Sequence, residues 1–112
     1  MKTEPVESAS VETDRRQSQR KRFLGKIEIE WGSAMLAGTV RDIGPQGLFV
    51  EIEPPLWVGA RFMARLMVSP VLVLDCVVRR VEPGAGIAVT FDISDDCGRS
   101  QLESLLATLP PV

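Results

Sequence analysis

Apolar and polar side chains alternate in short segments along most of this chain, and glycine or proline separates each segment from the next. In the clearest example, Ile27, Ile29 and Trp31 alternate with charged residues. Because successive side chains of a strand point to opposite faces, a period of two indicates a half-buried β-strand. The pattern recurs in six segments, at residues 26–31, 34–43, 48–53, 60–68, 71–81 and 85–91. The chain is therefore expected to fold mainly into strands.

The end of the chain has the period of a helix instead. Four leucines from Leu102 to Leu109 occupy positions i, i+3, i+4 and i+7, and Ser94 with the two aspartates after it suits a helix N-terminus. Two consecutive prolines then end the helix. Short strands joined by glycine and proline turns are typical of a small closed sheet. We predict a mainly β fold, a six-stranded antiparallel β-barrel over residues 26–91 with a C-terminal α-helix over residues 95–109.

The length of 112 residues suits a single domain with one hydrophobic core. The longest apolar run, near residues 71–74, is interrupted by Asp75 and is far shorter than the about 20 residues of a membrane span. The first residues also lack the basic start and apolar stretch of an export signal. We expect a cytoplasmic protein without membrane insertion, with a flexible arm at residues 1–14 and a single domain at residues 15–109.

The chain has no histidine, no tyrosine and 2 cysteines. Histidine is the usual general base and the commonest transition-metal ligand, so catalysis and metal binding lack their usual groups. Two cysteines are too few for a disulfide framework, and Cys76 lies on the apolar face of its segment, as a small core residue does. We therefore expect no enzymatic activity, no metal and no cofactor.

The net charge of −2 conceals a strong asymmetry along the chain. Residues 1–14 sum to −3, residues 15–22 to +5 and residues 23–112 to −4. The five basic residues of the positive segment are Arg15, Arg16, Arg20, Lys21 and Arg22. A guanidinium group binds phosphate through two parallel hydrogen bonds and also stacks on purines. The segment is interpreted either as a binding site for a nucleotide anion or as a solvated run of charge.

A second motif, Asp-Ile-Gly-Pro-Gln-Gly, covers residues 42–47 at the end of the second predicted strand. Interpreted as a turn, it needs Gly44 and Gly47 for positive φ and Pro45 for the first turn position. Interpreted as a site, Asp42 accepts hydrogen bonds from the N1 and N2 donors of guanine, and the glycines let a base approach the backbone. The residues alone leave both interpretations open.

Together and in this order, the two motifs resemble the PilZ domain, a bacterial receptor module for cyclic dimeric GMP (cyclic di-GMP). That family has an Arg-x-x-x-Arg motif before its first strand, matched here by Arg16-Gln-Ser-Gln-Arg20. Its second motif, Asp/Asn-x-Ser-x-x-Gly, is matched at residues 42–47 except that Gly44 replaces the serine. Further segments at residues 47–51, 55–59 and 86–91 also look like those of the family, so the resemblance covers about residues 14–109.

The resemblance implies ligand-binding roles for particular residues. Arg16 and Arg20 would hold the phosphates and guanines of cyclic di-GMP, with Asp42 and Gly47 as the acid and glycine of the second motif. The missing hydroxyl at Gly44 removes one polar contact, worth on the order of 0.5–1.5 kcal/mol. Arg15 would reach a further phosphate and favour capture of a stacked pair of ligands.

The expected mechanism is a switch that folds on binding. The basic segment is expected to be mobile without ligand and to close over the barrel when phosphates neutralise it, which changes the surface shown to a protein partner. Motility and biofilm formation are the implied outputs.

Two other functions are open from the sequence. The first is a divergent PilZ-like adaptor with weak or no cyclic di-GMP binding, which acts by protein contact in pilus or flagellar machinery; Gly44 favours it, and Arg16 and Arg20 oppose it. The second is a barrel that binds single-stranded nucleic acid. Such a barrel needs stacking aromatics on an exposed face, and Phe49 is the aromatic expected to point outward, so no nucleic-acid polymer is expected as a partner.

Two neighbouring strands are also expected to share an apolar outer face. Its members are Met63, Met67, Val71, Val73 and Val77. Exposed apolar patches mark protein contacts, so a homodimer or a partner protein is one interpretation. Docking of the C-terminal helix over the same face is the other.

Overall fold

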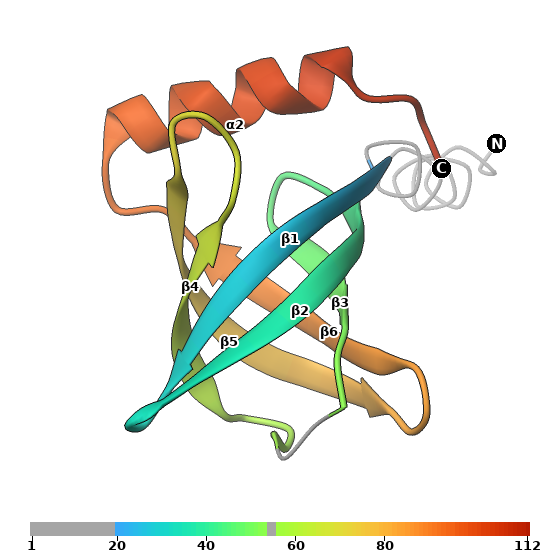
Figure 1. Ribbon diagram of the computed structural model, residues 1–112. Coiled ribbons are helices and arrows are strands. Elements are labelled where there is room, and N and C mark those ends of the chain that lie inside the picture. Colours follow the sequence, from blue (N-terminus) through green and yellow to red (C-terminus); the bar gives the residue numbers. More distant parts are fainter. Residues whose placement is uncertain (1–19, 54–55) are drawn as a thin grey trace, which may run out of the picture.

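The computed structural model describes residues 20–53 and 56–112, as six strands followed by a helix (Figure 1). The strands and the helix are β1 (Lys21–Trp31), β2 (Ala34–Ile43), β3 (Gly47–Glu51), β4 (Arg61–Leu66), β5 (Leu72–Glu82), β6 (Gly86–Asp92) and α2 (Asp96–Thr108). The predicted arm at residues 1–14 lies outside the described residues, as do Arg15 and Arg16.

The strands pair in the order β1-β2-β3-β6-β5-β4 and close into an antiparallel barrel, which confirms the predicted fold class. The alternation of apolar and polar side chains gives each strand one apolar side. When the sheet closes, these apolar sides all face the interior of the barrel. In β5, for example, Leu72, Leu74, Cys76 and Val78 are at most 2% exposed. A core of this kind fixes the register of each strand, since a slip of one residue would turn its apolar side chains outward.

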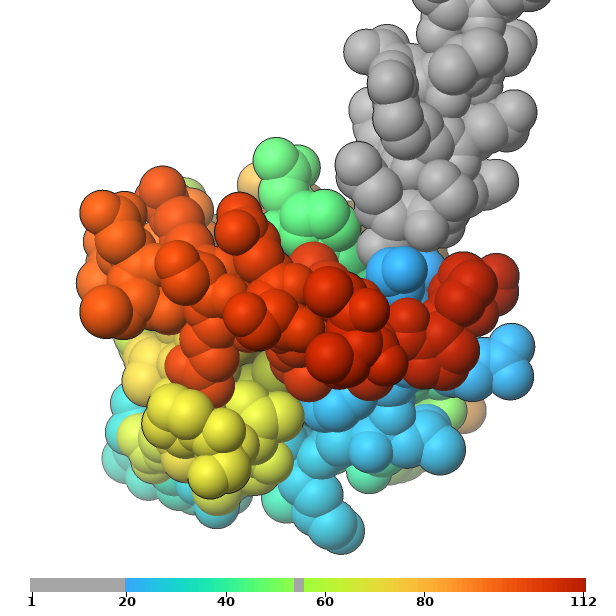
Figure 2. All heavy atoms as spheres, turned by 90° about the horizontal axis from the view of Figure 1, so that it is seen from above, coloured from blue at the N-terminus to red at the C-terminus, as the bar shows by residue number. Residues whose placement is uncertain are grey.

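Helix α2 crosses one end of the barrel, as Figures 1 and 2 both show. Leu102 is buried there, and Leu105, Leu106 and Leu109 are partly buried against the core. The N-cap is Asp95, whose carboxylate accepts a hydrogen bond from the Gly98 N–H at 2.7 Å. The sequence placed this role on Ser94, one residue too early. Asp and Ser are about equally good caps, so composition alone does not choose between neighbours.

Strand β1 begins at Lys21, five residues before the predicted start at Lys26. The pairing with β2 is irregular between Arg22 and Gly25, but inward and outward positions still alternate there. The sequence hides this alternation because the apolar side chain of Leu24 is 76% exposed. The expectation that the whole basic segment is mobile is therefore wrong for Lys21 and Arg22. Both residues belong to β1 and pair with the end of β2.

The apolar outer face of β4 and β5 is not covered by α2. Met63, Met67, Val71 and Val73 remain 41–49% exposed, and Val77 is half-buried. The alternative in which the helix docks over this face is therefore wrong. The helix instead covers the barrel end, where the glutamine side chain of Gln101 donates to the Pro70 carbonyl of the β4–β5 turn.

Candidate functional site

Arg20 and Asp42 form the centre of the candidate site. Asp42 lies near the end of β2 opposite Arg22 of β1, and Arg20 lies two residues before Arg22. The guanidinium of Arg20 donates from both Nε and Nη2 to Asp42 Oδ1, with a distance of 3.1 Å from Nε. The fold thus joins the second arginine of the first motif to the acid of the second, although 21 other residues separate them in the chain.

A β-bulge in β2 brings a third residue to this site. Val40 pairs with Val50 and Asp42 with Phe49, so Arg41 is the extra residue between them. Because Val40 and Ile43 are both buried, Arg41 and Asp42 both face outward. The Arg41 Nε is 3.6 Å from Asp42 Oδ2, so the carboxylate lies between two guanidinium groups.

Arg41 was not among the predicted site residues. The available signal was the spacing of Val40 and Ile43, two apolar residues three apart inside a segment of period two. Such a break in the alternation indicates a bulge, and the inserted residue then shares a face with its neighbour.

Phe49 packs against the guanidinium of Arg41, and its burial differs from the exposed position expected from the sequence. Its side chain lies outside the barrel, as predicted, yet it is only 2% exposed. The Arg41 guanidinium carbon lies 4.0 Å above the centre of the ring, within the range of a cation–π contact. Phe49 is therefore no exposed stacking platform, and the interpretation as a single-stranded nucleic-acid binder loses the aromatic on which it depended.

The loop between β2 and β3 forms the neighbouring wall. The Gly44 N–H donates to the Gly47 carbonyl at 2.8 Å, and the Phe91 N–H donates to the Gln46 carbonyl at 2.9 Å. A Cβ at Gly47 would lie 2.7 Å from the Val89 carbonyl oxygen, so close strand packing requires glycine there.

The turn interpretation expected positive φ at Gly44 and Gly47, and that expectation was wrong. The positive-φ glycines are Gly32, Gly59, Gly84 and Gly86, so neither Gly44 nor Gly47 is needed for that conformation. Gly44, at the position where the family motif has its serine, is buried.

The C-terminal residues border the site on the other side of β1. The Arg22 N–H donates to the Pro110 carbonyl at 2.9 Å, and the Val112 N–H donates to the Arg20 carbonyl at 3.2 Å. Figure 2 shows the start of β1 against the end of the chain. These hydrogen bonds connect Arg20 and the start of β1 to the segment that follows α2.

Within the described residues, the structure brings together Arg20, Asp42, Gly44 and Gly47 of the predicted site and adds Arg41. Arg20 and Arg41 flank the single carboxylate of Asp42, which leaves an excess of positive charge suited to an anion. The described residues contain no group of three side chains able to hold a metal ion. They also contain no helix long and apolar enough to cross a membrane.

Comparison with known proteins gives a consistent result. The model of the PilZ domain family matches residues 14–108. The PilZ domain of CeSA from a cellulose-synthesizing bacterium has a similar structure, with a TM-score of 0.66, 18% identity and coverage of 80% of this chain and 96% of that one. The Bacillus subtilis inhibitor of motility, MotI/DgrA, gives a TM-score of 0.67 and 15% identity over 83% of this chain and 49% of that one. No curated protein matches the sequence.

Proposed function

The chain belongs to the PilZ domain family, whose members are regulatory binding domains, and we propose that it is a cyclic di-GMP receptor that signals to a protein partner. In this proposal Arg15, Arg16 and Arg20 bind the phosphates and guanines. Asp42 accepts from a guanine edge, while Gly44 and Gly47 leave room for the base beside the loop. No chemistry on the nucleotide is required.

The contact between Arg20 and Asp42 is the observation that carries the proposal. It joins the group proposed to bind phosphate and the group proposed to bind guanine at one point of the barrel surface. The ligand would have to compete with this ion pair, whose side chains are 38% and 15% exposed. Separating an exposed pair costs about 0.2–1 kcal/mol, and this partly buried pair costs more. Each hydrogen bond to a charged group contributes about 1.5–3 kcal/mol, so two or more such bonds to the nucleotide offset the loss. The exchange therefore favours the nucleotide.

Arg41 is proposed to add a further contact to the ligand phosphates. Its guanidinium is held over Phe49 and beside Asp42, so little side-chain freedom remains to be lost on binding. A guanidinium held in this way binds an anion at a lower entropic cost than a freely rotating one.

The signal is proposed to pass through both ends of the chain. Lys21 and Arg22 are already part of β1, so the segment that closes over the nucleotide ends before them. Because residues 110–112 pair with residues 20–22, a nucleotide that draws Arg20 away from Asp42 also disturbs the tail behind α2. A partner protein that contacts the segment before β1 or the tail after α2 would therefore distinguish the nucleotide-bound chain from the free chain.

Gly44 favours one alternative, a PilZ-like adaptor that binds cyclic di-GMP weakly or not at all and acts by protein contact. The residue offers no hydroxyl where the family motif has one. The loss of one such hydrogen bond, about 0.5–1.5 kcal/mol, weakens binding roughly two- to tenfold and leaves the arginine contacts intact. We therefore retain the receptor as the principal function.

Isothermal titration of cyclic di-GMP into the full chain tests the proposal. Arg20→Ala should weaken binding about 10- to 150-fold, because it removes hydrogen bonds to a charged ligand. Arg22→Ala is the matched control, since it removes an exposed arginine two residues away, and it should cost less than about fivefold. Equal losses would indicate a nonspecific basic patch, and absence of heat with the unaltered chain would favour the adaptor.

A further inference from the structure

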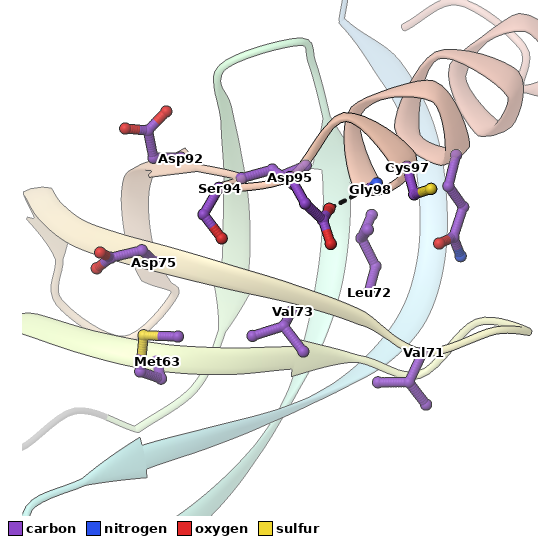
Figure 3. A pocket seen from close by; sticks show the side chains of 12 residues that line it. Met63, Val71, Leu72, Val73, Asp75, Asp92, Ser94, Asp95, Cys97 and Gly98 are labelled. Carbon is purple, nitrogen blue, oxygen red and sulfur yellow. Dashed lines mark hydrogen bonds between the residues drawn. The ribbon is translucent and has the colours of Figure 1, made fainter.

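A groove lies on the outer face of β4 and β5, where these strands meet the start of α2 (Figure 3). Its volume is about 300 Å³. Met63, Val71 and Val73 supply apolar side chains to it, and all three are at least 41% exposed. The groove belongs to a different part of the barrel from Arg20, which lies just before β1, and Asp42, which lies on β2.

The polar lining of this groove is acidic. Asp75, Asp92 and Asp95 line it, and none of the described lining residues is basic. Figure 3 shows Asp75 and Asp92 on one side of the groove and Val71 toward the other end. Asp95 already uses one carboxylate oxygen as the N-cap of α2.

Asp75 and Asp92 form an unfavourable pair within the isolated chain. They are directly opposite each other on β5 and β6, and like charges in this position destabilise a sheet. Across residues 20–53 and 56–112, no basic side chain comes within 4.0 Å of either carboxylate to form an ion pair. Arg61 and Arg79 lie nearby around an adjoining hollow, and Arg79 donates to Thr90 instead. Although Arg61 and Arg79 share that hollow with Asp75 and Asp92, neither forms an ion pair with them, so both carboxylates are free to pair with a cation from a partner.

We propose that this groove docks an amphipathic helix of a partner protein that carries lysine or arginine along one edge. Val71, just before β5, and Val73 on β5 are about 7 Å apart, and one turn of a helix rises about 5.4 Å, so apolar residues on successive helical turns can contact them. Met63 extends the apolar floor on β4, and its flexible side chain adapts to the shape of the partner. Basic residues along the edge of the helix then reach Asp75 and Asp92.

A second copy of this chain fits the groove less well than a basic helix. In a symmetric dimer the same patch faces itself, which brings Asp75 and Asp92 of one copy toward those of the other. Contact between the apolar residues would then cost charge repulsion. Charge complementarity therefore selects a basic partner.

The test is an NMR titration of the full chain with a synthetic amphipathic peptide of leucine and lysine, about 18 residues long to give five helical turns. A peptide with the same pattern but glutamate in place of lysine is the matched control. The lysine peptide should shift the backbone amides around Met63, residues 71–75 and residues 92–98, and binding should weaken when salt rises. The glutamate peptide should bind at least tenfold more weakly.

Variants of the chain locate the interaction. The double change Asp75→Asn with Asp92→Asn should weaken binding of the lysine peptide about three- to tenfold without loss of thermal stability, because it removes a like-charge pair. Val73→Ser should cost about tenfold through lost apolar contact. Val58→Ser is its control, since Val58 is 61% exposed in the loop between β3 and β4 at the opposite barrel end (Figure 1).

The outcomes separate the proposal from its rivals. Equal binding of both peptides, no binding, or shifts confined to other surfaces would overturn it. Sedimentation that shows a dimer abolished by Val73→Ser would assign the groove to a second copy and overturn it as well. Cyclic di-GMP binding is measured on the same variants and should be unchanged, because the groove and the nucleotide site share no residue.

Discussion

Replacing Gly47 with alanine should damage both the barrel and the nucleotide site. A Cβ at this position would be 2.7 Å from the Val89 carbonyl oxygen, a contact that no side-chain rotation relieves because the obstacle is backbone. Strands β3 and β6 pair at this point, Gly47 with Thr90, so relief requires the strands to separate locally. Overpacking of this kind costs about 1–3 kcal/mol, which lowers the Tm of a domain of this size by roughly 5–20 °C.

Thermal unfolding followed by circular dichroism measures this change. Gly84→Ala is the control, because Gly84 has φ of +79° but nothing within 4 Å of its Cβ, so strain alone costs about 1 kcal/mol. Gly47→Ala should lower the Tm more than Gly84→Ala. It should also weaken cyclic di-GMP binding, while Gly84→Ala should leave binding unchanged. If Gly47→Ala has the same Tm as the unaltered chain, the packing argument is refuted.

The remaining predictions concern Arg41 and the two cysteines. Arg41→Ala should weaken cyclic di-GMP binding about two- to tenfold in calorimetry, and unchanged affinity would remove Arg41 from the site. Burial, and secondarily the charge of Asp75, raises the pKa of Cys76 from 9.0 to about 12, so its folded state holds the proton more tightly than the unfolded state. The stability that this thiol contributes should be complete below pH 9 and should be lost between pH 9 and about 12, measured as a shrinking difference in unfolding free energy between the unaltered chain and Cys76→Ala. At about pH 8 a thiol reagent should titrate only the exposed Cys97, and both thiols only after unfolding; two fast-reacting thiols in the folded protein would contradict the burial of Cys76.

The barrel could be predicted from the sequence because a two-residue period directly reports which side chains face the core. The inner faces of β4, β5 and β6 follow the expected positions, such as Phe62 and Phe91. The prediction failed where the sequence pattern departs from this period. A bulge in β2 turns Arg41 outward, and the start of β1 at Lys21 was missed because the apolar residue Leu24 lies on the exposed side.

The candidate site depends on contacts between residues that are distant in the sequence. Asp42 and Arg20 are far apart in the sequence, so no local pattern predicts their contact, and only the family resemblance related them. Burial of Phe49 was missed because it depends on the guanidinium of Arg41 above its ring, a tertiary contact that alternation does not encode. The acidic groove was missed for the same reason, since Asp75 and Asp92 become neighbours only through the pairing of β5 with β6.

An NMR titration of the isotopically labelled full chain with cyclic di-GMP tests whether the nucleotide binds at Arg20 and Asp42. A receptor should show its largest amide shifts at Arg20, Asp42, Gly44 and Gly47, with smaller shifts at the C-terminal residues that pair with β1. The groove around Val73 should remain unshifted. Absence of shifts at millimolar nucleotide, or shifts that avoid Arg20 and Asp42, would contradict the proposed receptor.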